Sequence, residues 1–468
     1  MNIVHISAEC YPIAKVGGLA DVVGSLPKYQ NNSDVLSQVI MPFYDNKFTK
    51  GNEFSIIFES KLELGSKDFE YKIVTPINNN LGFNLFLVDI PKLLYKEYVY
   101  SNDDTDRFLA FQIATLDWLL TLDAKPTLVH CHDHHTGLVP FMMLQSKKYS
   151  LLKDIPTVFT IHNAQYQGWF SHDKVSLIPK FNFENVGLLD WDGSINPLAA
   201  AIKCATRVTT VSPSYMEELK GNANGLEWLL SHESAKCVGI LNGIDSEVWN
   251  PETDTYLIKN YTNGNVQSGC KENKNWLCEE FNLDVNKPLF AFIGRLVGEK
   301  GSDLFPEVFK KSLETENISI LLLGSGNKEV ELQLEELKSE FIGTYNAFIG
   351  YDERLSHIIY SGADFLLMPS RVEPCGLNQM YALRYGTIPI VRSIGGLKDT
   401  VIDILEEDGF GICHKEVTVS EITVAIERGV QLYKDQPKYK KIRKQIMSID
   451  HSWNASANKY INLYKSLN

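Results

Sequence analysis

The chain has 468 residues, of which 44% are hydrophobic and 22% charged, as expected for a globular protein of two to three domains. Its 45 basic and 58 acidic residues give a net charge of −13, which argues against general nucleic-acid binding, since that depends on neutralising phosphates. No apolar run approaches the length of a transmembrane helix, and no secretory or transit signal is visible.

Cysteine usage indicates the redox environment. The eight cysteines are spread along the chain without a C-x-x-C pair, which argues against a metal finger or a redox motif. Reduced thiols are typical of the cytosol. We therefore expect a cytoplasmic protein with neither a membrane nor a nucleic acid among its partners.

The chain repeats one unit, in which a short apolar run is followed by a polar or glycine-rich loop and a helix-like stretch. In the first half the predicted strands are 3–6, 39–41, 128–131, 157–161 and 207–211. In the second half they are 289–293, 318–323, 347–349, 364–368 and 387–391. Runs that are apolar throughout predict strands buried on both faces, and their alternation with helices predicts parallel sheets.

This pattern predicts an α/β protein of two doubly wound, Rossmann-like domains facing each other across a cleft. A polar stretch at about 250–287 is expected to be a linker or hinge, so the domains would span 1–250 and 251–450. Open parallel sheets bind ligands at the carboxyl ends of their strands, and that is where the chemically informative residues lie.

The first such segment is a glycine loop that follows strand 3–6. Lys15, Gly17 and Gly18 precede a predicted helix start, and glycines let the backbone approach a ligand closely. Backbone N–H groups and one ammonium could bind a phosphate here, although the spacing matches neither the Rossmann fingerprint nor Walker A. A tight strand-to-helix turn without a ligand is the alternative.

Histidines follow two central strands of the first half. The run His130–His135 holds four histidines and Asp133, but adjacent strand positions point to opposite faces, so one metal cannot use them all. We therefore expect no metal. Asp133 is expected either to face the cleft or to cap the following helix. His162 and Asn163 follow strand 157–161, and His162 could also be a structural histidine.

Two further clusters follow strands of the second half. Arg295 and Lys300 flank a glycine-containing turn and could bind a diphosphate from two sides, unless they are solvated surface charges. Glu373 precedes Pro374, a fixed turn and a helix start, where N–H groups could bind sugar hydroxyls or a phosphate, unless they serve only to cap the helix.

With these residues in view, the chain resembles bacterial-type glycogen and starch synthases, glycosyltransferase family 5 of the two-Rossmann-domain (GT-B) class. The resemblance spans nearly the whole length. Its segments are 15–22, 133–138, 160–168, 241–251, 294–301 and 370–377. Their order and number make the resemblance specific, and it adds the expectation of a C-terminal helix at 451–468 that returns to the first domain.

The resemblance implies transfer of glucose from ADP-glucose, or UDP-glucose, to the non-reducing end of an α-1,4-glucan such as glycogen, with retention and without a metal or other cofactor. Lys15, Gly17, Gly18, Arg295 and Lys300 would contact the diphosphate. Glu373 with the backbone of Cys375, Gly376 and Leu377 would hold the glucose, and His162 would lie near the reacting centre. The other expected substrate-binding residues are Asp21, Asp133, Asn163, Asn242 and Tyr351, the last beside the nucleotide base.

Three positions depart from the usual family pattern. His134 stands where tryptophan is common, Asn378 where threonine is common, and Glu299 where glutamine is common. None of these changes removes an expected catalytic group. Two alternatives stay open: a related GT-B transferase using UDP-glucose or a small-sugar acceptor, and a non-catalytic glucan-binding paralogue.

Overall fold

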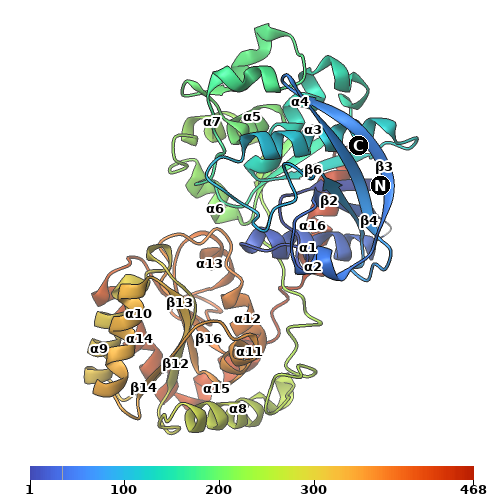
Figure 1. Ribbon diagram of the computed structural model, residues 1–468. Helices are drawn as coiled ribbons and strands as arrows, with labels where there is room; N and C mark the ends of the chain where they lie inside the picture. The colour runs from blue at the N-terminus through green and yellow to red at the C-terminus, as the bar shows by residue number, and fades with distance from the viewer. Residues whose placement is uncertain (34, 468) are drawn as a thin grey trace. The chain divides into compact units, whose positions relative to one another are not determined.

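The computed structural model describes residues 1–33 and 35–467, so Asn468, the last residue of the expected terminal helix, lies outside it. The chain divides into two compact units. Unit 1 comprises Met1–Gly243 and Trp453–Asn468, and unit 2 comprises Ile244–Ser452. Figure 1 shows the elements of each unit.

Unit 1 is built on a nine-stranded sheet in the order β11-β10-β7-β6-β1-β2-β5-β4-β3. Its strands are β1 (Asn2–Ile6), β2 (Leu36–Pro42), β3 (Phe54–Leu64), β4 (Lys67–Pro76), β5 (Asn84–Asp89), β6 (Leu128–His132), β7 (Thr157–Ile161), β10 (Arg207–Thr210) and β11 (Cys237–Gly239). A small ribbon of β8 (Asp190–Trp191) and β9 (Ser194–Ile195) stands apart. The strands that follow one another across the sheet as β11, β10, β7, β6, β1, β2 and β5 pair in parallel. Strands β4 and β3 add an antiparallel hairpin at the β5 edge.

The helices of unit 1 connect and cover these strands. They are α1 (Gly18–Asn31), α2 (Lys47–Gly51), α3 (Thr105–Thr121), α4 (Val139–Gln145), α5 (Pro197–Cys204), α6 (Pro213–Leu219), α7 (Glu227–His232) and α16 (Trp453–Lys465). Short 3₁₀ helices are η1 (His134–Thr136), η2 (Lys147–Leu152), η3 (His172–Leu177), η4 (Phe183–Leu188) and η5 (Ser234–Lys236).

The C-terminal helix α16 belongs to unit 1, where it lies beside α1 (Figure 1). Leu26 and Tyr29 of α1 share a buried cluster with Trp453, Tyr460 and Tyr464 of α16. Burying aromatic side chains of this size contributes about 2 kcal/mol each, which is enough to hold an amphipathic helix against the sheet layer.

Unit 2 is a six-stranded, fully parallel sheet in the order β14-β13-β12-β15-β16-β17. The strands are β12 (Leu289–Leu296), β13 (Ser319–Gly326), β14 (Tyr345–Ile349), β15 (Phe365–Met368), β16 (Ile388–Arg392) and β17 (Ile412–His414). Numbered within the unit, this is the order 3-2-1-4-5-6 of a Rossmann fold. Both units are thus Rossmann-like, as the sequence predicts.

The helices of unit 2 are α8 (Val266–Glu280), α9 (Phe305–Thr315), α10 (Lys328–Glu340), α11 (Glu353–Gly362), α12 (Asn378–Tyr385), α13 (Gly395–Thr400), α14 (Val419–Lys434) and α15 (Gln436–Ile446). Its 3₁₀ helices are η6 (Asn263–Asn265), η7 (Gly298–Lys300) and η8 (Ser302–Leu304).

The expected linker at 250–287 is wrong, because the stretch is folded into unit 2. Helix α8 lies within it and buries Val266, Cys270 and Leu277 in the unit's core. The ammonium of Lys274 on the same helix contacts the Asp364 carboxylate at 2.7 Å. The segment is polar because α8 exposes its outer face, and the spacing of its apolar residues is that of an amphipathic helix.

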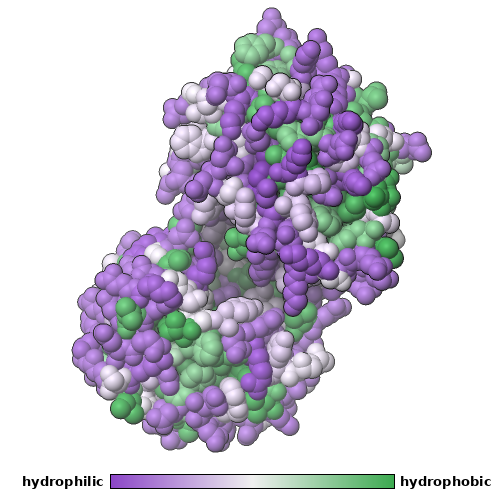
Figure 2. All heavy atoms as spheres, in the orientation of Figure 1, coloured by the Kyte–Doolittle hydropathy of each residue, from purple (hydrophilic) through white to green (hydrophobic). Residues whose placement is uncertain are grey.

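Hydrophilic side chains cover most of the face of each unit that Figure 2 shows. Among the helices of the described residues, none combines the length and the apolar character that crossing a bilayer requires.

Candidate functional site

The glycine loop joins β1 to α1, but its first N–H groups are bound by the protein itself. The Oε2 atom of buried Glu9 accepts hydrogen bonds from the N–H of Val16 at 2.5 Å and of Gly17 at 3.0 Å. Its Oε1 atom accepts from the Tyr100 hydroxyl at 2.5 Å. The expectation that these N–H groups face a ligand therefore needs correction, since a carboxylate already occupies the anion position. The loop retains the Lys15 side chain and the start of α1 as groups that could face an anion.

Lys15 and the two glycines lie on the open side of this loop. The Lys15 ammonium contacts the Asp21 carboxylate at 2.7 Å, and about half of the lysine side chain is exposed. A Cβ atom added at Gly17 or Gly18 would meet nothing within 4 Å. The protein's own packing therefore does not require glycine at either position, and the space beside the backbone is open.

Asp133 and His162 come together at the ends of β6 and β7. The Oδ1 atom of Asp133 accepts from the backbone N–H of His162 at 2.8 Å. Asp133 makes no side-chain cap to the following η1, so the capping alternative is wrong. Its φ of +57° with ψ of 174° is a strained backbone conformation, of the kind found at functional sites.

The Asp133 carboxyl has an unusual pKa for an aspartate. Burial raises it from 3.8 to about 7, against the lowering effect of the hydrogen bonds from the backbone of His162 and Asn163. Desolvation also lowers the pKa of His162 to about 3, so this ring is neutral at pH 7. The carboxyl and imidazole therefore do not form a charged pair.

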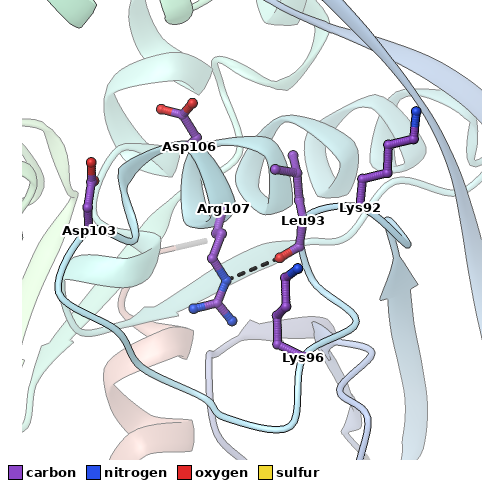
Figure 3. A pocket seen from close by; sticks show the side chains of 6 residues that line it. All are labelled: Lys92, Leu93, Lys96, Asp103, Asp106 and Arg107. Carbon is purple, nitrogen blue, oxygen red and sulfur yellow. Dashed lines mark hydrogen bonds between the residues drawn. The ribbon is translucent and has the colours of Figure 1, made fainter.

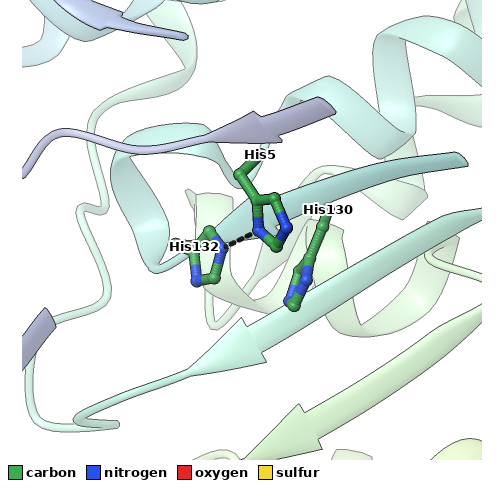
Figure 4. A group of neighbouring side chains, drawn as sticks. All are labelled: His5, His130 and His132. Carbon is green, nitrogen blue, oxygen red and sulfur yellow. Dashed lines mark hydrogen bonds between the residues drawn. The ribbon is translucent and has the colours of Figure 1, made fainter. Parts of the chain in front are cut away.

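His162 is the outermost of four neighbouring imidazoles. Its Nε2 lies 3.0 Å from Nδ1 of His132, whose Nε2 lies 3.0 Å from Nδ1 of His5 (Figure 4). His5 Nε2 lies 2.9 Å from Oε1 of Gln30 on α1. His5, His130 and His132 are fully buried, while His162 keeps 9% of its surface exposed.

Three of these rings have the spacing of a metal site. Ring nitrogens of His5, His130 and His132 lie within 4.8 Å of one another, on neighbouring strands β1 and β6 (Figure 4). His130 and His132 are two positions apart on β6, so their side chains point to the same face. His5 lies beside them because β1 pairs with β6. All six ring nitrogens are hydrogen-bonded, however, with His130 contacting Tyr464 at 2.7 Å and Thr160 at 2.6 Å. A metal would have to displace these partners, so we assign none.

The remaining expected residues of unit 1 lie in nearby loops. Asn163 uses its Oδ1 to accept from the N–H of Gln165 at 3.0 Å, which shapes the turn after β7. Asn242 is buried, and within the described part of the chain its Oδ1 has no hydrogen-bond partner. His134 contacts His135, with ring centroids 3.7 Å apart.

In unit 2, Lys300 and Glu373 lie together between the carboxyl ends of β12 and β15. Lys300 Nζ contacts Oε2 of Glu373 at 2.5 Å, and the Ser370 hydroxyl donates to the same oxygen at 3.0 Å. No hydrogen bond to Oε1 of Glu373 is present among the described residues. The carboxylate is thus anchored through one oxygen and retains the other.

Arg295 does not join this pair. Its guanidinium lies 3.7 Å from the Glu299 carboxylate, and 71% of the side chain is exposed. The backbone carbonyl of Glu299 accepts hydrogen bonds from the backbone N–H groups of Arg371 at 2.7 Å and Val372 at 3.3 Å. These bonds connect the turn after β12 to the loop that carries Glu373.

The loop from Glu373 to Leu377 is shaped by glycines. Gly376 has a φ of +71°, which favours glycine, just before α12. A Cβ atom at Gly395 would lie 2.1 Å from the Glu373 carbonyl oxygen, and one at Gly396 would lie 2.0 Å from that of Cys375. The start of α13 therefore packs directly beneath this loop.

Two other residues complete the unit 2 part of the site. Asn378, the first residue of α12, donates through Nδ2 to the Ile293 carbonyl at 2.8 Å and so ties α12 to the end of β12. Tyr351 is 84% exposed on the loop after β14, where its ring is accessible to a planar ligand.

A separate hollow of about 250 Å³ lies between the segment that follows β5 and the first turn of α3 (Figure 3). It is lined by Lys92, Leu93, Lys96, Asp103, Asp106 and Arg107. Arg107 donates to the Leu93 carbonyl at 3.2 Å and pairs with Asp104. None of the expected site residues lines it.

The sequence did not predict which residues contact the site residues. These partners are Glu9, Gln30, Tyr100 and Ser370, and the role of His5 and His132 was also not predicted. The signal available was the presence of histidines in two buried strands, His5 in β1 and His130 and His132 in β6. Their proximity depends on β1 pairing with β6, which brings together residues 127 positions apart.

Comparison with known proteins agrees with this architecture. Residues 2–232 match the family described as the starch synthase catalytic domain, and residues 277–446 match glycosyl transferases group 1. A glycogen synthase from Flavobacterium johnsoniae is 51% identical over 467 residues, covering 99% of this chain and 98% of the relative. One from Streptococcus pneumoniae is 35% identical and covered in full by this chain.

Solved structures agree as well. The catalytic domain of starch synthase IV from Arabidopsis thaliana, bound to ADP and acarbose, superposes with a TM-score of 0.89 at 33% identity, covering 100% of this chain and 99% of that one. A sucrose-phosphate synthase from Thermosynechococcus elongatus has a TM-score of 0.61 at 17% identity, with 100% and 98% covered, and shares the fold. The GT-B fold and the full-length identity together show that this chain belongs to the glycogen and starch synthase family, enzymes that transfer glucose in glycogen and starch synthesis.

Proposed function

We propose that this chain transfers glucose from ADP-glucose to the non-reducing end of an α-1,4-glucan, with retention of the anomeric configuration. The observation that carries the proposal is the contact between Lys300 and Glu373, in which one carboxylate oxygen is anchored and the other has no hydrogen bond among the described residues. Such a pair offers a cation to a phosphate and an acceptor to a sugar hydroxyl side by side.

The cations would act on the leaving group. As the bond between sugar and phosphate breaks, negative charge develops on the departing diphosphate, and preorganised cations stabilise that charge. We assign this role to Lys300 and Arg295 of unit 2 and to Lys15 of unit 1, with Gly17 and Gly18 leaving room for the phosphate beside the backbone.

The glucose would be held by hydrogen bonds rather than by charge. Oε1 of Glu373 accepts from a hydroxyl, and the backbone of Cys375, Gly376 and Leu377 at the start of α12 adds polar groups. We assign His162 and Asp133 to the sugar side of unit 1, where the backbone N–H of His162 donates to the Asp133 carboxylate. Asp21, Asn163 and Asn242 complete the substrate-binding residues that we propose for that unit.

The proposal of an adenine nucleotide in the donor sugar rests on one comparison. The starch synthase IV neighbour was solved with ADP and acarbose, and this chain is 33% identical to it over its full length. Tyr351 exposes its ring on the loop after β14, where it could stack on a base. Because the eight cysteines are all free thiols, we also place the enzyme in the cytoplasm.

Radiolabelled ADP-glucose and UDP-glucose, each offered with and without glycogen, test the proposal. We expect label in glycogen from ADP-glucose, with ADP released. Transfer to a small sugar without labelling of glycogen would refute the glucan acceptor, and faster labelling from UDP-glucose would refute the donor. Glycogen binding without nucleotide release would make the chain a non-catalytic paralogue.

A matched pair of lysine variants tests the site. Lys300→Ala should lower kcat/KM for ADP-glucose roughly a hundredfold, or about 3 kcal/mol, by analogy with the loss of one oxyanion donor. Lys310→Ala is the control, since that lysine lies on α9 and pairs with Glu340 at 2.6 Å. Equal kcat/KM values for the two variants would contradict the role of Lys300.

A further inference from the structure

A chain of hydrogen bonds runs from helix α1 through two buried imidazoles to His162. The atoms are Gln30 Oε1, His5 Nε2 and Nδ1, His132 Nε2 and Nδ1, and His162 Nε2, with successive distances of 2.9, 3.0 and 3.0 Å. We propose that this chain of hydrogen bonds fixes His162 in the tautomer with its hydrogen on Nε2. Nδ1 of His162 then accepts a hydrogen bond from a hydroxyl of the bound sugar. Gln30, His5 and His132 are then positioning residues, and the sugar as ligand rests on the function proposed above.

The direction of the chain is set at Gln30. Its Nε2 donates to the Tyr464 hydroxyl at 3.2 Å, which leaves the carbonyl oxygen Oε1 facing His5. The Ser37 hydroxyl donates to the same Oε1 at 2.7 Å. An amide oxygen only accepts, so His5 must carry a hydrogen on Nε2.

Each neutral ring passes this constraint to the next. A neutral imidazole has one donor and one acceptor nitrogen, so Nδ1 of His5 accepts and Nε2 of His132 donates. Nδ1 of His132 then accepts, and Nε2 of His162 donates to it. The remaining nitrogen of His162, Nδ1, is therefore an unprotonated acceptor, and among the described residues no hydrogen bond to it is present.

The rings are neutral because they are buried. Desolvation lowers the pKa of His5 to about 4 and that of His162 to about 3. It also lowers the pKa of His132 well below its usual value, and the neighbouring imidazoles add to the effect. A charged imidazole would donate from both nitrogens and break the order of donors and acceptors.

The neighbouring ring of His130 supports the same pattern without taking part in the chain. The Tyr464 hydroxyl, which accepts from Gln30, donates its own hydrogen to Nδ1 of His130 at 2.7 Å. Nε2 of His130 then donates to the Thr160 hydroxyl at 2.6 Å. Within the series from Gln30 to His162, reversing His5 or His132 alone would set two hydrogens or two lone pairs against each other, which is costly in a buried place.

The tautomer can be measured by ¹⁵N NMR on the full-length protein with ¹⁵N-labelled histidine, because protonated and unprotonated ring nitrogens differ widely in chemical shift. The His162 signals are assigned by their loss in His162→Gln. We expect a protonated Nε2 and an unprotonated Nδ1 on His162 in the wild type. A protonated Nδ1 overturns the proposal without further variants.

Two variants test the chain, and one matched variant controls for lost packing. His132→Phe removes the acceptor of His162, and Gln30→Leu removes the acceptor that sets the direction two rings away. Both should shift His162 towards the Nδ1-protonated form. His130→Phe makes the same ring replacement at an equally buried position of β6, outside the chain, and should leave the His162 tautomer unchanged. Unchanged His162 shifts in both chain variants, or equal shifts in all three, overturn the proposal.

Kinetics separate this inference from the proposed function. We expect kcat to fall on the order of tenfold or more in His132→Phe, because Nδ1 of His162 would no longer be held as an acceptor, and to stay within about twofold in His130→Phe. If the wild type transfers no glucose but Nε2 of His162 is protonated, the proposed function is refuted and the tautomer assignment is supported. If the wild type transfers glucose but Nδ1 of His162 is protonated, the proposed function is supported and the tautomer assignment is refuted.

Discussion

Replacing Asp133 by Asn should make the enzyme more stable at alkaline pH. The carboxyl of Asp133 has its pKa raised from 3.8 to about 7 by burial, although the side chain retains partial contact with water. Asn has nearly the same shape, can accept the N–H of His162 through its amide oxygen, and meets the same backbone strain at this φ of +57° as Asp does. The substitution therefore removes the charge with little change of structure.

The sign and size follow from proton linkage. Between pH 4 and 7 the folded protein holds a proton on Asp133 that the unfolded chain has released, so this group makes stability fall as pH rises. A shift of about three pKa units corresponds to about 4 kcal/mol at most. Because water still reaches the side chain, we expect about half of this, so Asp133→Asn should exceed the wild type by roughly 2 kcal/mol at pH 8 and by less than about 1 kcal/mol at pH 4.5.

Urea unfolding of wild type and variant at the two pH values measures the difference, with a probe that follows unit 1. Asp192→Asn is the control, because Asp192 also has a positive φ of +52° but is exposed in the β8–β9 turn. The pH dependence of the Asp133→Asn difference is read relative to that of this control. A difference for Asp133→Asn that is the same at both pH values, or that favours the wild type at pH 8, would refute the burial argument.

Three further substitutions test other parts of the structure. Gly17→Ala should change stability by less than about 0.5 kcal/mol, because its Cβ meets nothing, while raising KM for ADP-glucose; an unchanged KM would exclude a close approach of the diphosphate. Glu299→Gln should lower that KM up to about fivefold at low salt, since it frees Arg295 from an exposed ion pair; a higher KM would show that Glu299 instead positions the arginine. Lys274→Met should cost unit 2 about 3–5 kcal/mol in urea unfolding, because Asp364 stays buried without its cation, and a loss below about 1 kcal/mol would contradict this.

The sequence predicts the parallel strands well because they are buried on both faces. β6, β7 and β15 are buried at every position, and none of them contains Asp, Glu, Lys or Arg, so each stands out in the sequence as a run without charged residues. The hairpin of β3 and β4 escaped notice because β3 is mostly exposed and lacks such a run. Its available signal was the short turn at Gly65, whose φ is +63°. Helix α8 was missed because its polar outer face dominates the composition.

The candidate site shows a similar division. Residues at strand ends, such as Asp133, His162 and Glu373, are predictable because the strands themselves are predictable and ligands bind at their carboxyl ends. Their partners are not, because they come from elements distant in the sequence. His5 lies 127 positions from its hydrogen-bond partner His132, and Gln30 joins the histidines from α1. Such contacts depend on strand order and helix placement, which local patterns do not encode.

The three proposed diphosphate cations are all paired with carboxylates of the protein itself. Lys15 and Arg295 contact acidic neighbours at 2.7 and 3.7 Å in exposed ion pairs, which are worth about 0.2–1 kcal/mol each. A phosphate can therefore draw either side chain away at little cost. Lys300 contacts Glu373 at 2.5 Å with both side chains largely buried, so separating them would leave a poorly solvated carboxylate. We therefore expect the exposed cations to exchange partners when the nucleotide sugar binds, whereas Lys300 keeps its carboxylate and bridges it to the phosphate.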